Sequence, residues 1–271
     1  MQKRQKNREL YFTELSITSE KYFIPYVSDY KKIEAGMNIL EVGCGDGGNL
    51  LPFSEMGCHT IGVDMSEGRI KDAILFFKKS NAKGDFIASD IFKLKELEYK
   101  FDLIICHDVI EHIENKSLFL KNLKRYLKSG GIIFMSFPAW QMPFGGHQQI
   151  CQSPIISHFP FLHLLPCSIY KAILKLNGES QGCIKELLEI KQTRTSIELF
   201  ERVAKQEELL ITNRTLFFIN PHYEIKFGLK PKKLLHFFSY IPHVRNYFTT
   251  SCFYILNPQK EQIDESFAVT N

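Results

Sequence analysis

Several common signatures are absent from this sequence, and each absence narrows its function. The seven cysteines form no CxxC pair, which argues against a zinc knuckle or a disulfide framework and favours a reduced, cytoplasmic chain. No apolar window reaches membrane-spanning length without a proline, histidine or charge. The formal net charge of +4 is small, so no nucleic-acid partner is expected. There is also no internal repeat or low-complexity tract.

The first 34 residues do not resemble a targeting segment. Their basic start leads into Glu9 and Glu14 rather than an apolar run, so no signal peptide is expected. Aromatic and charged residues are mixed over 9–31, which predicts one or two amphipathic helices. We assign 1–34 to an N-terminal helical segment. We favour helices that pack on the core over helices that form an aromatic lid above a ligand.

Predicted strands and helices alternate through the next hundred residues. Short apolar runs predict strands at 38–42, 59–64, 85–90, 101–106 and 132–138. The segments between these runs carry apolar residues at helical spacing or glycine-rich turns. This alternation is typical of an α/β fold with a parallel sheet and right-handed crossovers.

A glycine-rich loop, residues 43–48, follows the first predicted strand. A strand, a glycine turn and a helix together form the nucleotide pocket of open α/β sheets. The second and third predicted strands end in Asp64 and Asp90. Glu41 lies two residues before the first glycine of the loop. Its carboxylate would repel a pyrophosphate there, so a ligand with a positively charged group is favoured. An NAD(P)-dependent oxidoreductase that uses the same loop is kept as an alternative.

This series of motifs resembles the class I S-adenosylmethionine-dependent methyltransferases, in particular the type 11/type 12 group that includes ubiquinone-type O-methyltransferases. The resemblance covers about residues 35–138. It implies a Rossmann-like methyltransferase fold, in which a doubly wound, mostly parallel sheet has seven strands. The last strand would be antiparallel, and residues 251–256 are its candidate. A helical cap would be inserted after strand five.

The resemblance also implies S-adenosylmethionine as cofactor and S-adenosylhomocysteine as product. Asp64 would accept hydrogen bonds from the ribose hydroxyls, Asp90 and Ile91 would meet the adenine, and His107 would lie near the sulfonium. The residues expected to contact or support the cofactor are Glu41, Gly43, Gly45, Gly47, Asp64, Asp90, Ile91 and His107. Carboxylates at strand ends can instead cap the following helix, but their occurrence at matching strand ends favours one shared ligand.

Catalytic candidates follow strands four and five. Methyl transfer from a sulfonium is an in-line displacement, and a base is needed only for a weakly acidic acceptor. His107 and Glu111 follow strand four, and His147 lies in a Gly-Gly turn after strand five. A purely structural role for His147 in this turn is an equal alternative to a catalytic one. The spacing of His107, Asp108, Glu111 and His112 matches no familiar metal site, so no metal is predicted.

The remainder of the chain divides by composition. Between Pro154 and Tyr170 there is no Asp, Glu, Lys or Arg, and a buried cap is favoured over contact with a membrane surface. Basic and aromatic residues are interleaved between 223 and 247. We favour lysines that extend from a packed helix over a site for single-stranded nucleic acid or an anionic head group. We assign 35–138 to the cofactor-binding core, 139–195 to an acceptor-binding cap, 196–258 to completion of the core sheet and 259–271 to a flexible tail.

The predicted function is S-adenosylmethionine-dependent methylation of a small molecule or of a lipid or glycan intermediate, with O-methylation preferred. The aromatic, neutral cap suits an apolar acceptor such as a quinone or lipid, and aromatic rings also stack on sugars. The residues leave O-, N- and C-methylation open. A non-catalytic S-adenosylmethionine-binding module is the second alternative to the oxidoreductase.

Overall fold

Residues 7–259 are described in the computed structural model. Of the tail predicted over 259–271, all but the first residue lies outside the described residues. Within 7–259, no helix combines the length and the apolar content needed to cross a bilayer.

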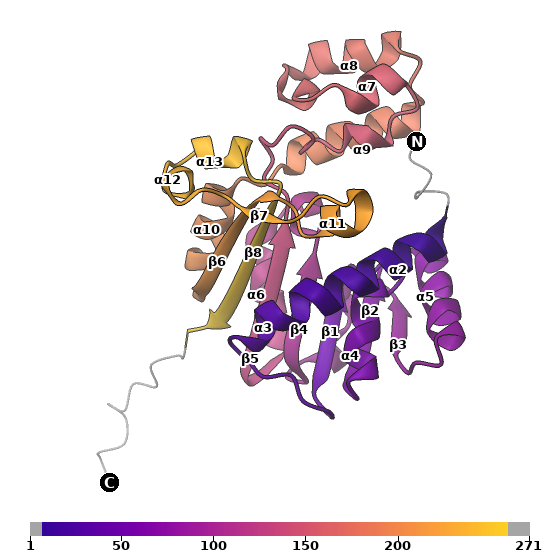
Figure 1. Ribbon diagram of the computed structural model, residues 1–271, viewed down its shortest axis with the longest axis vertical. Coiled ribbons are helices and arrows are strands. Elements are labelled where there is room, and N and C mark those ends of the chain that lie inside the picture. Colours follow the sequence, from indigo (N-terminus) through magenta and orange to yellow (C-terminus); the bar gives the residue numbers. More distant parts are fainter. Residues whose placement is uncertain (1–6, 260–271) are drawn as a thin grey trace.

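An eight-stranded sheet forms the centre of the molecule, in the order β3-β2-β1-β4-β5-β8-β6-β7 (Figure 1). The strands are β1 Asn38–Val42, β2 His59–Asp64, β3 Asp85–Ala88, β4 Phe101–His107, β5 Leu127–Phe137, β6 Leu209–Ile219, β7 Lys232–Lys233 and β8 Ser251–Pro258. Strands β1 to β5 are parallel, and β8 runs antiparallel to β5 and β6. The doubly wound sheet and its antiparallel last strand are therefore confirmed.

The predicted count of seven strands is wrong. The eighth strand, β7, consists of two exposed lysines that pair with the end of β6 at the edge of the sheet. An exposed two-residue edge strand has no alternation of apolar and polar residues, so no sequence pattern marks it. The third strand is also shorter than predicted, because β3 ends two residues before Asp90.

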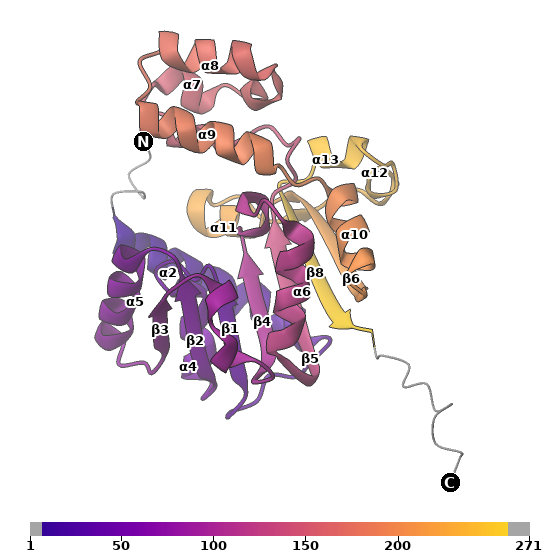
Figure 2. The ribbon, with the colours of Figure 1, turned by 180° about the vertical axis from the view of Figure 1, so that it is seen from behind.

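Helices cover both faces of the sheet (Figures 1 and 2). One face packs against α2, α3, α4 and α5, and the other against α6 and α10. The helices are α2 Arg8–Thr18, α3 Ile24–Ser28, α4 Leu51–Glu55, α5 Glu67–Lys79, α6 Lys116–Tyr126, α7 Pro154–His158, α8 Cys167–Leu176, α9 Gln181–Thr193, α10 Ile197–Gln206, α11 His222–Phe227, α12 His236–Ser239 and α13 Val244–Tyr247. The central strands β1 and β4 are thus buried on both sides, as their nearly continuous apolar sequences require, whereas β3 at the edge of the sheet is only partly buried.

Serine side chains fix where several helices begin. Ser66, Ser180 and Ser196 each precede a helix and accept a hydrogen bond from the backbone N–H three residues further on, at 3.4, 3.2 and 3.1 Å. Each hydroxyl satisfies one N–H that the helix itself leaves unpaired. These caps place the starts of α5, α9 and α10, and the cap of α5 also ends the loop at the carboxyl end of β2.

The segment 139–195 contains α7, α8 and α9, and lies beyond the carboxyl ends of the parallel strands (Figures 1 and 2). It has a small apolar core of its own, in which Tyr170, Leu174 and Leu187 are fully buried. Its two ends meet, because the Trp140 N–H donates to the Thr195 carbonyl at 2.9 Å. The insertion therefore leaves and rejoins the core at one place.

Glu41 is a carboxyl group inside the core at the end of β1. Only 1% of its surface is exposed, and its Oε1 accepts a hydrogen bond of 2.6 Å from Asn49 Nδ2. This bond ties β1 to the turn that follows the glycine loop. Burial raises the pKa of Glu41 to about 8, despite the opposing effect of the bond from Asn49. The folded chain therefore favours the protonated acid at neutral pH.

We expect Glu41→Gln to change how stability depends on pH. The Glu41 pKa rises from 4.5 to about 8 on folding. Between these values the unfolded chain has released a proton that the folded chain keeps, so stability falls as pH rises. Glutamine mimics the protonated acid and should raise the free energy of unfolding at pH 8 by more than about 1 kcal/mol, with little effect near pH 4.

Denaturant unfolding of the ligand-free chain across this pH range measures the effect. Glu55→Gln, at an exposed carboxyl group on α4, is the matched control. Parallel pH profiles for Glu41→Gln and the unsubstituted chain would contradict the expectation.

Candidate active site

A cavity of about 440 Å³ lies at the carboxyl ends of β1, β2 and β4. The strand order changes direction between β1 and β4, which is where open α/β sheets bind ligands. Among its lining residues are four of those predicted to meet the cofactor, namely Gly43, Asp64, Asp90 and Ile91. We call it the cofactor cavity.

The glycine loop is held in place by a very close packing contact. Gly43 has a φ of +73°, and a Cβ atom there would lie 2.3 Å from Val109 Cγ2. Its N–H donates to the Val63 carbonyl at 2.7 Å, which attaches the loop to the end of β2. Only glycine meets both requirements without strain. The backbone can therefore form a wall of the cavity directly.

The Asp64 carboxylate lies beside this loop and accepts two backbone hydrogen bonds. Oδ2 accepts from the Gly45 N–H at 2.9 Å, and Oδ1 accepts from the Ser66 N–H at 2.8 Å. Each carboxylate oxygen can accept more than one hydrogen bond, so the group retains capacity for a ligand. Asp90 Oδ1 similarly accepts from the Phe92 N–H at 3.1 Å. Both carboxylates thus cap local turns while they also line the cavity.

The other residues predicted for the cofactor, namely Glu41, Gly45, Gly47 and His107, do not line this cavity. The His107 side chain is largely buried, with its ring centroid 5.0 Å from that of Phe23. Its predicted role beside the sulfonium therefore stays a prediction.

Arg69 is a cavity residue that sequence reasoning missed. It comes from the first turn of α5, and its Nη1 lies 3.1 Å from where a Cβ atom of Gly45 would stand. Its guanidinium therefore lies against the glycine loop. The sequence offered one indirect signal for Arg69. Ser66 caps the start of α5 and so places the first turn of that helix beside the strand ends.

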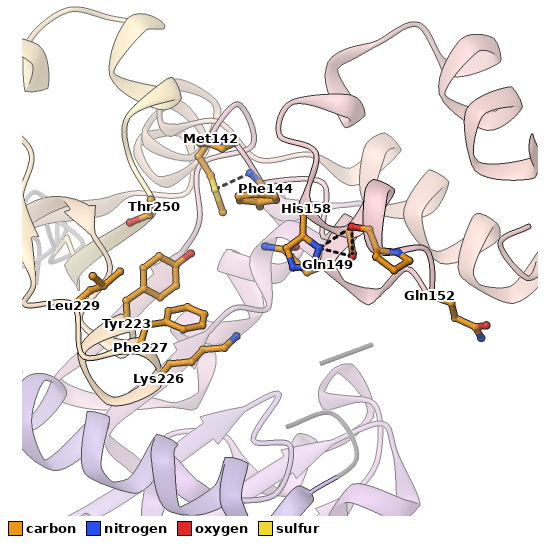
Figure 3. A pocket seen from close by; sticks show the side chains of 13 residues that line it. Met142, Phe144, Gln149, Gln152, His158, Tyr223, Lys226, Phe227, Leu229 and Thr250 are labelled. Atoms are coloured by element: carbon orange, nitrogen blue, oxygen red, sulfur yellow. Dashed lines mark hydrogen bonds between the residues drawn. The ribbon is translucent and has the colours of Figure 1, made fainter. Parts of the chain in front are cut away.

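Two adjoining cavities, of about 610 and 220 Å³, lie between the segment 139–195 and α11, and Figure 3 shows the side chains that line the first of them. We call them the outer and the inner acceptor cavity. The residues that line both are Met142, Phe144, Gln149, Tyr223, Lys226 and Thr250. The outer cavity is mostly apolar, with Phe227 and Leu229 on the α11 side.

Asp108 connects the cofactor cavity with the inner acceptor cavity, because it lines both. It is the first residue after β4, and its φ of +54° is uncommon for a residue with a side chain. Its N–H donates to the Ser136 carbonyl at 2.9 Å, which holds this backbone against β5. A carboxylate is therefore fixed at the boundary between the two spaces.

His147 and Glu111, two of the three predicted catalytic residues, lie close together. A tight turn presents His147, since a Cβ atom on Gly146 would lie 2.1 Å from the Cβ of His163. His147 Nε2 lies 4.0 Å from Glu111 Oε1, too far for a hydrogen bond. The third, His107, is not a lining residue of any of the three cavities.

The surroundings of this pair shift its protonation. Burial, assisted by the nearby His112, lowers the pKa of His147 to about 4, and burial also lowers the pKa of His112. Burial and the negative charge of Asp108 raise the pKa of Glu111 well above its ordinary value. Both imidazoles are therefore neutral at pH 7, with lone pairs available for a proton or another partner.

The part of the chain that contains the cofactor cavity matches a known family. A methyltransferase-domain family model matches residues 33–178. The ubiquinone biosynthesis O-methyltransferase of Rickettsia canadensis is 31% identical over 115 residues, 42% of this chain and 48% of that protein. The protein of the same name from Bartonella bacilliformis is 28% identical over 145 residues, 51% of this chain and 58% of that protein. The matches span about half the length of these relatives.

Solved structures resemble almost the whole chain. Magnesium protoporphyrin IX methyltransferase from Synechocystis has a TM-score of 0.52 at 15% identity, covering 90% of this chain and 82% of its own. Geranyl diphosphate C-methyltransferase from Streptomyces coelicolor has a TM-score of 0.53 at 12% identity, covering 89% and 79%. These likenesses establish the fold. Because the family model matches more than half of the residues, the chain belongs to the methyltransferase-domain family, and the class I S-adenosylmethionine-dependent methyltransferase fold predicted from its sequence is confirmed.

Proposed function

We propose that this chain transfers a methyl group from S-adenosylmethionine to a hydroxyl group of a small molecule with an apolar portion. The observation that carries the proposal is the connection of two cavities through Asp108. One cavity has the glycine wall and strand-end carboxylates suited to the cofactor, and the other is mostly apolar. A donor and an acceptor bound in them would meet at one carboxylate.

In this proposal the cofactor lies along the carboxyl ends of β1 and β2. Asp64 accepts hydrogen bonds from the ribose hydroxyls, and Asp90 and Ile91 contact the adenine. The Arg69 guanidinium, beside the glycine loop, suits the carboxylate of the methionyl group. The Asp108 carboxylate would favour the positive sulfonium at the inner end. Glu41 supports the loop from behind rather than touching the ligand.

The acceptor would enter through the outer cavity. Phe144, Tyr223 and Phe227 offer aromatic contacts to an apolar group, and the side chain of Lys226 lines the same space (Figure 3). The acceptor oxygen attacks the methyl carbon, the carbon–sulfur bond breaks, and its electron pair stays on sulfur as S-adenosylhomocysteine. The hydroxyl proton must also leave, and the neutral His147, which lines the inner acceptor cavity, is placed to accept it.

The two alternatives receive less support. The family match favours a methyltransferase over an NAD(P)-dependent oxidoreductase. A non-catalytic binding module would need only the cofactor cavity, whereas this chain also has acceptor cavities beside it. Methyl transfer from cofactor with a labelled methyl group to fractions of a metabolite extract tests the proposal. Tight cofactor binding without a labelled product in any fraction would favour the non-catalytic module.

Asp64→Asn should weaken binding of S-adenosylhomocysteine. The substitution removes the charge from the acceptor of two ribose hydrogen bonds, at a cost of about 1–3 kcal/mol in binding free energy. Calorimetric titration measures the change. Asp85→Asn, at the opposite and exposed end of β3, is the control and should bind normally. Unchanged affinity in folded Asp64→Asn would refute the ribose assignment.

Gln149→Trp should block the acceptor and spare the cofactor. Gln149 lines both acceptor cavities but not the cofactor cavity, so an indole there would fill the path between them. We expect methyl transfer to fall by at least about tenfold, which corresponds to about 1.4 kcal/mol in the barrier, with unchanged affinity for S-adenosylhomocysteine.

Gln152→Trp is the matched control, because Gln152 is an exposed residue that lines the outer cavity alone. Its effect on the transfer rate should be the smaller of the two. Equal rates for Gln149→Trp and the unsubstituted chain would place the acceptor elsewhere.

A further inference from the structure

The outer acceptor cavity is lined by positive charge but not by negative charge. Among the described residues that line it there is no Asp, Glu or Arg, and Lys226 is the single lysine. The other lining side chains are apolar groups, amides, hydroxyls and the imidazole of His158. One amine therefore stands in a space that is otherwise mostly apolar.

The two segments that form this cavity lack carboxylates over long stretches of sequence. Residues 139–178 and 225–259 supply all of its lining residues except Tyr223. Neither stretch contains an Asp or a Glu. The second stretch also carries the exposed lysines 230, 232 and 233, which follow α11. An anion that approaches the cavity is therefore attracted by these two walls and not repelled by them.

The carboxylate nearest to Lys226 in sequence does not change this charge pattern. Glu224, on the same helix, forms an ion pair with Lys21 at 2.9 Å. It lines neither acceptor cavity. The positive charge of Lys226 is thus the one that the lining of the outer cavity presents to a bound molecule.

Lys226 combines an apolar surface with a charged end. It is half-buried on α11, and its Nζ lies 5.1 Å from the centre of the Phe227 ring. Figure 3 shows the two side chains beside each other. The methylene groups of the lysine and the aromatic ring offer apolar contacts, and the amine offers three hydrogen-bond donors. A molecule with an apolar portion and an anionic group would find a partner for each here.

The charges of the two acceptor cavities would also orient such a molecule. Asp108 lines the inner cavity but not the outer one, whereas Lys226 lines both. An anionic group is repelled by the first of these side chains and attracted by the second. It would therefore remain on the side of the outer cavity, and the hydroxyl group of the same molecule would point inward, toward the methyl donor.

We infer that the methyl acceptor is an anionic amphiphile, whose carboxylate or phosphate group pairs with Lys226 while its apolar portion lies in the rest of the outer cavity. The inference rests on the proposed function and specifies the class of its acceptor. It also revises the preference, drawn from the sequence, for lysines that extend from a packed helix. The reason is that α11 has no buried residue.

The pairing would make Lys226 a specificity-determining residue. A hydrogen bond between an ammonium and an anionic oxygen is stronger than one between neutral groups. Apolar surroundings strengthen it further, because they lower the local dielectric constant. An acceptor without the anionic group would lose this bond and keep only its apolar contacts. Lys226 would thus select among acceptors that have similar apolar portions.

Binding of three eight-carbon probes to the full chain, with S-adenosylhomocysteine present, tests the inference. Octanoate and octyl phosphate carry an anionic group, and 1-octanol has the same apolar chain without one. In calorimetric titration at about 0.15 M salt, which screens exposed charges, we expect at least one anionic probe to bind at least about tenfold more tightly than 1-octanol. The tighter of the two anionic probes identifies the preferred group.

Lys226→Met should abolish this preference. Methionine keeps an apolar stem and removes the charge, so 1-octanol should bind as before. Lys226→Arg keeps the charge and should retain the preference. Lys230→Met is the matched control, because Lys230 is exposed and lines neither acceptor cavity. Retained affinity for S-adenosylhomocysteine will show that each variant is folded.

Three results would overturn the inference. The first is that neither anionic probe binds more tightly than 1-octanol. The second is that Lys226→Met keeps the preference. The third is an equal loss in Lys230→Met, which would indicate general attraction to a basic surface, as for anionic membranes or nucleic acid.

The proposed function has a separate test. Methyl transfer to a neutral acceptor from the extract would leave the proposed function standing and reject the anionic acceptor. Failure of the unsubstituted chain to bind S-adenosylhomocysteine would reject the proposed function instead. The two failures are therefore distinguishable.

Discussion

The close packing of Gly43 against Val109 is the constraint on which the site depends. The glycine ends β1 in a conformation that favours glycine, and its N–H is bonded to the end of β2. Val109 belongs to the loop that leaves β4, so one contact sets the spacing of three strand ends. The cofactor cavity opens beside this contact, with Asp64 on one side and Asp108 on the other. A side chain at position 43 would force these walls apart.

The loop after β4 carries part of the proposed chemistry. Asp108 lines both the cofactor cavity and the inner acceptor cavity, and Glu111 and His112 follow within one turn. The long insertion after β5 supplies His147 and one wall of the acceptor cavities. Since the insertion begins and ends at Trp140 and Thr195, which are hydrogen-bonded to each other, its size can vary without disturbing the sheet. Donor binding and acceptor binding are thus assigned to separate parts of one chain.

Sequence reasoning was most successful where the signal is local. Apolar runs located the parallel strands, and the positions of Asp64 and Asp90 placed them at the cofactor cavity. It failed for β7, whose two lysines carry no pattern, and it did not identify Arg69, whose position depends on how α5 packs beside the loop. His107 is the last residue of β4 rather than the first residue after it, and its ring packs against Phe23 from the N-terminal helices. Such packing cannot be inferred from spacing within one loop.

The sequence by itself predicted the fold and the location that we propose for the methyl-donor site. Strand periodicity and the glycine loop are encoded by neighbouring residues, and parallel topology brings the strand ends to one edge. Tertiary structure alone decided how the acceptor side is built. Its cavities combine residues near 142–158 with residues of α11, and the cluster of Glu111 and His112 with His147 joins two loops far apart in the chain. These groups meet only because β4 and β5 are adjacent and the insertion folds back over their ends.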